Sequence, residues 1–142
     1  MRRRRALAAA ALLAAGGAVL AAAAAAAAEP GPEEDYVLHC SGCHRLDGSG
    51  APGVAPGLRD LGRLLEAPEG RAYLVRVPGV AQAPLDDVRL ARLLNFVLGE
   101  MSASPASPPY APEEVARLRR SPLRDPRAER ARLAPPAAPS LR

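Results

Sequence analysis

The chain has 142 residues, 49% of them hydrophobic and 24% charged, which suits one small domain and excludes a large multidomain enzyme. Only 3% are aromatic and none is tryptophan, so a close-packed core must use Leu, Val and Ala unless another group fills it. The net charge of +4 comes from Arg2 to Arg5, because 15 arginines balance 15 acidic residues beyond residue 28. With no basic stripe interleaved with aromatics, nucleic acid is not an expected partner.

The first 28 residues have the pattern of a secretory signal peptide. Four arginines precede an uncharged run from Ala6 to Ala28, which ends in small residues that fit the cleavage rule. We therefore predict cleavage after Ala28 and export to the bacterial periplasm. An uncleaved run of this length could span a bilayer, so a membrane is an expected partner only if the leader is retained.

The rest of the chain divides by composition into a folded domain over 29–101 and a Pro/Arg-rich C-terminal extension over 102–142. In the domain, helices are expected over 32–43, 58–65, 68–77 and 87–100. Pro32 with the acids after it suits a helix N-terminus, and Asp86 or Asp87 can cap the last helix. No strand pattern appears, so the predicted fold class is all-α.

Cys40 and Cys43 are the only cysteines, and His44 follows directly, which gives a CxxCH motif. On one continuous helix Tyr36, Cys40 and Cys43 would share a face. CxxCH is typical of c-type haem attachment, in which two thiols bind one edge of a porphyrin and the adjacent imidazole binds the iron. A Gly- and Pro-rich stretch follows over 45–57, which predicts a long loop.

Two further stretches extend this pattern. Asp47-Gly48-Ser49-Gly50 is similar to the glycine-rich loop of class I monohaem cytochromes c, and Pro56-Gly57-Leu58 is similar to their Pro-x-Leu segment. The region from about Pro32 to Phe96 resembles that family. The resemblance implies a small helical domain around one covalently attached haem, with the capped last helix crossing the first.

The same resemblance implies a set of site residues. Cys40 and Cys43 would form the haem thioethers, and His44 would be the proximal iron ligand. The carbonyl of Pro56 would accept a hydrogen bond from Nδ1–H of His44 and so fix its tautomer, and Leu58 would pack on the ring.

The distal side departs from the family pattern. Where the family has a Met-Pro pair, this chain has Val77-Pro78, and valine cannot bind iron. Met101 is one candidate distal ligand, although it also extends the apolar face of the last helix; Gln82 is another. An open or water-filled site is a further alternative. His39 directly precedes a haem-bonded cysteine, so we expect it at the surface.

Two other interpretations of the cysteine pair are weaker. A thioredoxin-like oxidoreductase needs a βαβ unit, and none is visible. A zinc site would need His39 and His44 together with both cysteines, and four ligands within six residues could hardly surround one ion tetrahedrally.

In the extension, prolines start possible helices over 112–120 and 126–133, and Val115, Leu118 and Leu123 could dock on the domain. Its arginines form a basic surface that could fold over the acidic domain, approach the haem propionates or meet a partner protein, although the simplest interpretation is a solvated face. The last residues, 134–142, are expected to be disordered.

These features predict an electron carrier rather than an enzyme. Its expected redox partners are a periplasmic dehydrogenase and another cytochrome or an oxidase. The alternative is a haem protein with an open distal site for ligand binding or peroxide chemistry.

Overall fold

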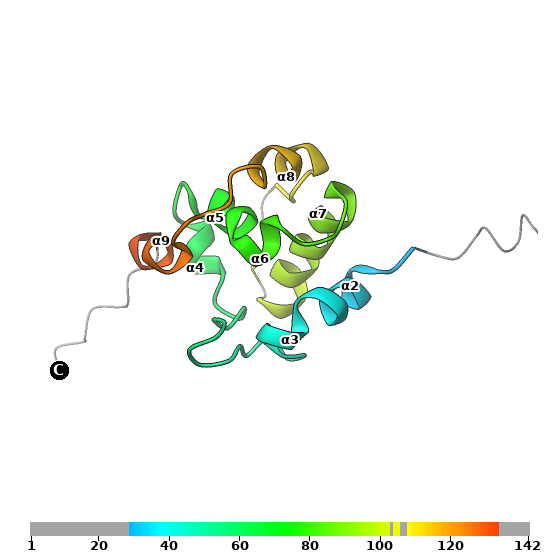
Figure 1. Cartoon of the computed structure of the whole chain (residues 1–142), viewed down its shortest axis with the longest axis horizontal. Helices are drawn as coiled ribbons and strands as arrows, with labels where there is room; N and C mark the ends of the chain where they lie inside the picture. The colour runs from blue at the N-terminus through cyan, green and yellow to red at the C-terminus, as the bar shows by residue number, and fades with distance from the viewer. Residues whose placement is uncertain (1–28, 103, 106–107, 134–142) are drawn as a thin grey trace, which may run out of the picture. The chain divides into compact units, whose positions relative to one another are not determined.

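Helices make up the regular secondary structure of the computed structural model, which describes residues 29–102, 104–105 and 108–133 (Figure 1). They are α2 (Pro32–His39), α3 (Ser41–His44), α4 (Gly62–Leu65), α5 (Gly70–Arg76), α6 (Pro78–Ala81), α7 (Asp87–Phe96), the π-helical turn η1 (Val97–Met101), α8 (Pro112–Leu118) and α9 (Pro126–Leu133). The described residues contain no strand, only an isolated bridge between Ala51 and Ala55, so the all-α class is confirmed.

Several predictions fall outside the described residues: the leader over 1–28 and the expected disorder over 134–142. Among the helices that are described, none is long and apolar enough to cross a membrane.

The N-terminal helix breaks at Cys40, where the backbone adopts φ −124° and ψ −38°. The amide of Cys40 still bonds the carbonyl of Tyr36, but its own carbonyl accepts from the amides of Cys43 and His44 and begins the short helix α3. The predicted continuous helix over 32–43 is therefore wrong. Cys40 lies at the junction and is half-buried, whereas Cys43 lies within α3 and is exposed.

The last helix of the domain begins where the sequence predicted and ends earlier. Asp86 is the N-cap, and its Oδ1 accepts a hydrogen bond of 2.8 Å from the amide of Arg89. The α-helix ends at Phe96, and the predicted span to residue 100 is replaced by the π-helical turn η1. A π turn adds a residue to the helical repeat, so it changes the faces on which the last side chains lie.

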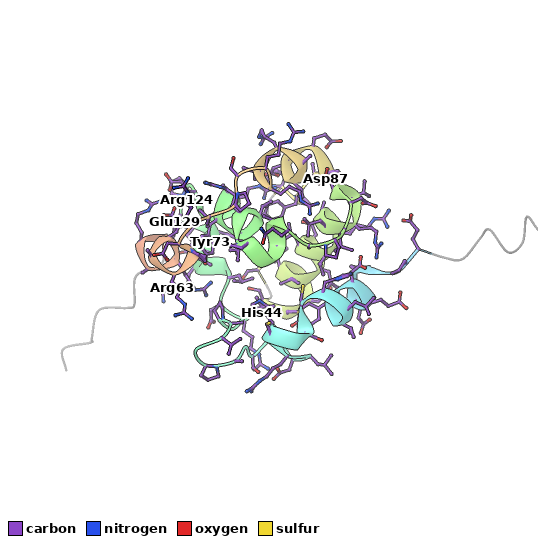
Figure 2. All side chains as sticks on the ribbon, viewed as in Figure 1. His44, Arg63, Tyr73, Asp87, Arg124 and Glu129 are labelled. Carbon is purple, nitrogen blue, oxygen red and sulfur yellow. The ribbon has the colours of Figure 1, made fainter. Side chains whose placement is uncertain are left out.

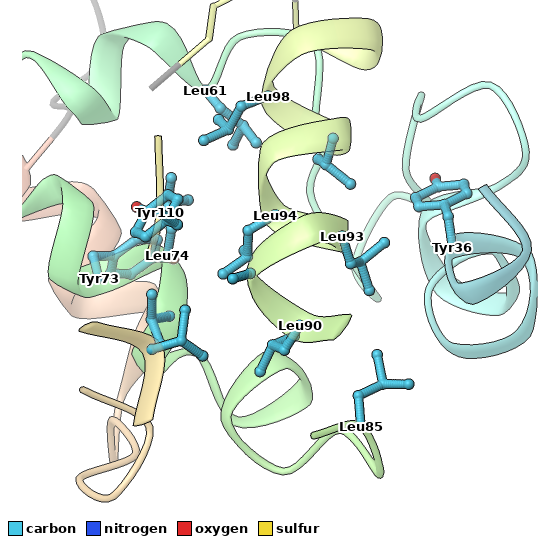
Figure 3. Close-up of a cluster of buried hydrophobic side chains, with 14 of the residues drawn as sticks. Tyr36, Leu61, Tyr73, Leu74, Leu85, Leu90, Leu93, Leu94, Leu98 and Tyr110 are labelled. Carbon is cyan, nitrogen blue, oxygen red and sulfur yellow. The ribbon is translucent and has the colours of Figure 1, made fainter. Parts of the chain in front are cut away.

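The core lies on both sides of α7. Figure 3 shows Tyr36 on one side of this helix and Tyr73 and Tyr110 on the other, all three at most 4% exposed. The rings of Tyr36 and Phe96 lie 6.4 Å apart, and the buried carboxylate of Asp35 pairs with Arg89, so α2 packs on α7. The few aromatic residues are thus concentrated in the core.

The C-terminal segment, residues 108–133, packs onto α5 and α7 and belongs to the same compact unit as the described residues from Gly31 onward. The predicted helices over 112–120 and 126–133 are present as α8 and α9. Val115 is fully buried, and Leu118 and Leu123 pack against the core, as predicted.

The interpretation of the extension's arginines as a solvated face is wrong for Arg119. Its guanidinium donates to the carbonyls of Ala81, Ala83 and Leu85 at 2.6–3.0 Å. It also pairs with the carboxylate of Asp87 at 3.1 Å. The boundary at 101 and 102 is therefore a change of composition and not a structural division.

Candidate functional site

A cavity of about 700 Å³ lies between the CxxCH segment and the helices that pack around it. Its walls come from the α2–α3 junction, the loop over 49–58, α5, α6, α7 and α9, and most of the lining side chains are apolar. Cavities of about 300–1,000 Å³ with such walls are typical of small-molecule and cofactor sites.

His44 lines this cavity and has a fixed ring orientation. Its Nδ1 lies 2.9 Å from the carbonyl oxygen of Pro56. A carbonyl can only accept, so Nδ1 carries the proton and Nε2 keeps a free lone pair. This contact is the one that the resemblance implied, and it prepares His44 to bind a metal through Nε2.

The loop that supplies Pro56 is held by its own backbone. The amide of Gly50 bonds the carbonyl of His44 at 2.9 Å, and the amide of Leu58 bonds the carbonyl of Gly48 at 2.8 Å. Gly50 has φ +77°, and a Cβ there would lie 2.6 Å from the backbone of Pro56 and Gly57. Only glycine allows this approach, so the Gly-rich sequence positions the carbonyl that orients His44.

The two cysteines carry no disulfide, and Cys40 lines the cavity beside His44. Burial raises the pKa of the Cys40 thiol, and the nearby Asp35 and Cys43 raise it further. Thiol–disulfide oxidoreductases need a lowered pKa, so this environment argues against that interpretation. The described residues contain no group of three or more His, Cys, Asp or Glu side chains that could hold a metal ion.

The predicted ring-packing residue and the predicted distal ligand lie in different places. Leu58 lines the cavity, as does Val77. Met101 is not among the lining residues; it packs against the core, and its Cε lies 3.1 Å from where a Cβ on Gly48 would be. Gln82 and His39 are exposed and do not line the cavity either. The structure thus brings Cys40, His44, Pro56 and Leu58 together in the cavity lining and leaves Cys43 and Met101 outside it.

Three further residues line the cavity: Tyr73, expected from the sequence only as part of the helix over 68–77, and Arg127 and Arg130, which belong to the basic surface of the extension. Tyr73 is buried in α5, and its hydroxyl donates to the carbonyl of Pro126 at 3.2 Å. Arg127 donates to the carbonyl of Gly53 at 2.9 Å, so α9 also contacts the glycine-rich loop. The i, i+3 spacing of the two arginines indicates a shared helix face, but nothing in the local sequence indicates what that face covers.

The residues present fit a covalently attached haem. Nε2 of His44 is available beside the cavity-lining thiol of Cys40, the second thiol, Cys43, is exposed in α3 outside the lining, and the apolar walls suit a large flat ring. No model of a known protein family matches the chain, and no curated protein matches it.

Proposed function

We propose that the protein is an exported monohaem c-type cytochrome. Cys40 and Cys43 would hold the haem as thioethers, His44 would be the proximal ligand, and Leu58 would pack on the ring. The observation that carries the proposal is the contact between Nδ1 of His44 and the carbonyl of Pro56, in the wall of a largely apolar cavity next to CxxCH. The signal-peptide pattern over 1–28 supports export to the periplasm.

The function that these residues support best is single-electron transfer. When bound, the haem iron supplies a one-electron couple. Among the described residues, the cavity lining includes no carboxylate and no imidazole besides His44. The proposed partners are a periplasmic dehydrogenase as donor and another cytochrome or an oxidase as acceptor.

One observation favours a second function. Met101 lies outside the lining, and Val77 stands where the resembled family has methionine. Apart from Cys40 and His44, the described lining offers no imidazole, thioether or thiolate to the iron. The second candidate is therefore a haem protein with an open distal position that binds a small ligand such as carbon monoxide.

Production of the full chain together with a haem-attachment system tests both functions. We expect one covalent haem by mass, which is lost in Cys40→Ala/Cys43→Ala. Spectra with and without carbon monoxide then separate the functions: bands that ignore carbon monoxide support an electron carrier, and rapid binding supports the open site.

A matched pair of variants locates the distal ligand. Met101→Leu keeps an apolar side chain and removes the sulfur, and we expect its spectrum to equal that of the wild type because Met101 lies outside the cavity lining. A change to high-spin bands in Met101→Leu, with Leu118→Met unchanged as the control because Leu118 packs against the core outside the cavity lining, would assign Met101 as the ligand.

A further inference from the structure

Two arginines stand out in the wall of the cavity. Arg127 and Arg130 lie three residues apart on α9, and both line a space whose other walls are mainly apolar. None of the described Asp or Glu residues is among the lining residues. The cavity therefore has a positively charged edge that no cavity-lining carboxylate balances.

Both side chains retain hydrogen-bond donors. Arg127 uses one nitrogen for the carbonyl of Gly53, and a guanidinium has five N–H donors. Arg130 is half-buried and forms no hydrogen bond or ion pair with any described residue. The neighbouring acid Glu129 pairs instead with Arg132 at 2.7 Å, so it does not neutralise the pair in the cavity.

The helix that carries the two arginines is held in place. Oδ1 of Asp125 accepts from the amides of Arg127 and Ala128 at 3.1 and 2.9 Å and caps the first turn. The hydroxyl of Tyr73 donates to the carbonyl of Pro126 at the start of α9, and the carbonyl of Arg76 accepts from the amide of Leu123 just before it. In the view of Figure 2, Tyr73 lies between His44 and the α9 residue Glu129.

We propose that α9 is the carboxylate-binding end of the cavity and that Arg127 and Arg130 pair with the two carboxylate groups of the bound cofactor. The inference rests on the proposed function, because the carboxylates are those of haem. A haem carries its two propionates away from the vinyl groups through which cysteines attach it. Attachment at Cys40 and Cys43 and pairing on α9 would then hold different edges of the same ring.

The test compares the pH profile of the reduction potential in three holoproteins: wild type, Arg127→Gln/Arg130→Gln and the control Arg124→Gln. Arg124 is exposed and does not line the cavity. A carboxylate beside two guanidinium groups stays ionised, so we expect a level wild-type potential between about pH 5 and pH 8.

In the double variant the carboxylate pKa rises into this window, and protonation is favoured in the more negative ferrous state. We expect its potential to fall as the pH rises, while Arg124→Gln follows the wild type. Arg130→Gln alone breaks no hydrogen bond among the described residues, and its reduction potential should also fall as the pH rises, but less steeply. If the double variant is not recovered with haem, Arg130→Gln is the variant compared with the wild type.

The outcomes separate the two proposals. If the wild type carries no covalent haem, the proposed function fails. If haem is attached and the profiles of the arginine variants coincide with that of the wild type, the assignment of α9 is overturned and the proposed function stands.

Discussion

Two segments of the chain line the same cavity and are held by different interactions. The loop over 45–58 is fixed mainly by hydrogen bonds between its own backbone groups, with glycines in left-handed conformations. The C-terminal segment is fixed mainly by arginine side chains that reach backbone carbonyls far away in the sequence. These arginines are Arg71, Arg76, Arg119 and Arg127.

The difference shows which of these two cavity walls, the loop over 45–58 (the first wall) or the C-terminal segment over 108–133 (the second wall), can be predicted from the sequence. A backbone-held loop needs glycine at fixed places, so its composition indicates the structure. A segment held by arginine can take its carbonyl partners from anywhere on the surface, because every residue has a carbonyl. The first wall was therefore predictable and the second was not.

The largest expected effect comes from a substitution in the first wall, the loop over 45–58. In Gly50→Ala the new Cβ meets the backbone of Pro56 and Gly57 at 2.6 Å and the residue must keep φ +77°. Overpacking and left-handed strain together should lower the free energy of unfolding by about 3–5 kcal/mol. Urea unfolding of the full chain measures the loss.

Gly53→Ala is the matched control, because its φ is +76° and nothing lies within 4 Å of the added Cβ. It should cost only the left-handed penalty of about 1–2 kcal/mol. Equal losses in the two variants would show that the close approach at Gly50 does not exist in solution.

The next largest effect is expected from a substitution in the second wall, at Arg119, which forms several hydrogen bonds with backbone carbonyls. Arg119→Ala leaves three carbonyls of the α6–α7 connection without their donor and removes the pair with Asp87. We expect a loss of about 2–4 kcal/mol in the free energy of unfolding. Arg120→Ala, at an exposed neighbour, should stay within about 0.5 kcal/mol. Similar small effects in both variants would mean that the extension is solvated after all.

The same substitution can be made on both walls. The Tyr36 hydroxyl donates to the carbonyl of Arg45, where the loop starts, and the Tyr110 hydroxyl donates to the carbonyl of Arg71 at 2.8 Å and anchors the C-terminal segment. Tyr→Phe at either position keeps the ring and should cost about 1 kcal/mol. If the thermal or urea midpoint of unfolding falls for Tyr36→Phe but not for Tyr110→Phe, the C-terminal segment does not pack on the rest of the domain in solution.

The smallest expected effect depends on pH. The Asp47 carboxylate accepts from Ser49 and pairs with Arg59, and these contacts lower its pKa. A lowered pKa means that the ionised group stabilises the fold above the unfolded pKa of about 4 and that this contribution is lost as the pH falls through the folded pKa.

Asp47→Asn should therefore slightly reduce stability at neutral pH and leave it unchanged in acid, as measured by urea midpoints at both pH values. Asp60→Asn is the control, because Asp60 is exposed and lies next to Arg59 in the sequence. A loss for Asp47→Asn that persists in acid would assign the effect to something other than the charge.

The contact between His44 and Pro56 and the start of α7 were predictable because their signals are local. The CxxCH spacing predicted Cys40 and His44, the Pro-x-Leu stretch predicted Pro56, and Asp86 predicted the start of α7. Physical effects outside any short window account for the failures. Cys40 has no Pro or Gly beside it to announce the break between α2 and α3, and the π-helical turn after Phe96 has no sequence signature.

For a related reason, the sequence could not decide between the alternatives for the extension's arginines. The extension's helices start at prolines and were predicted, but Arg127 and Arg130 gain meaning only from the cavity they line. An i, i+3 arginine pair on an exposed helix normally indicates a solvated face.

The position of α9 at the end of the described chain also sets an order of events. A ribosome adds about 5–20 residues per second, so residue 133 follows Leu58 by roughly 4–15 s. During that interval His44 and the glycine-rich loop already exist, whereas the wall that α9 supplies does not. The α9 side is therefore the last of the described cavity walls to become available as the chain grows.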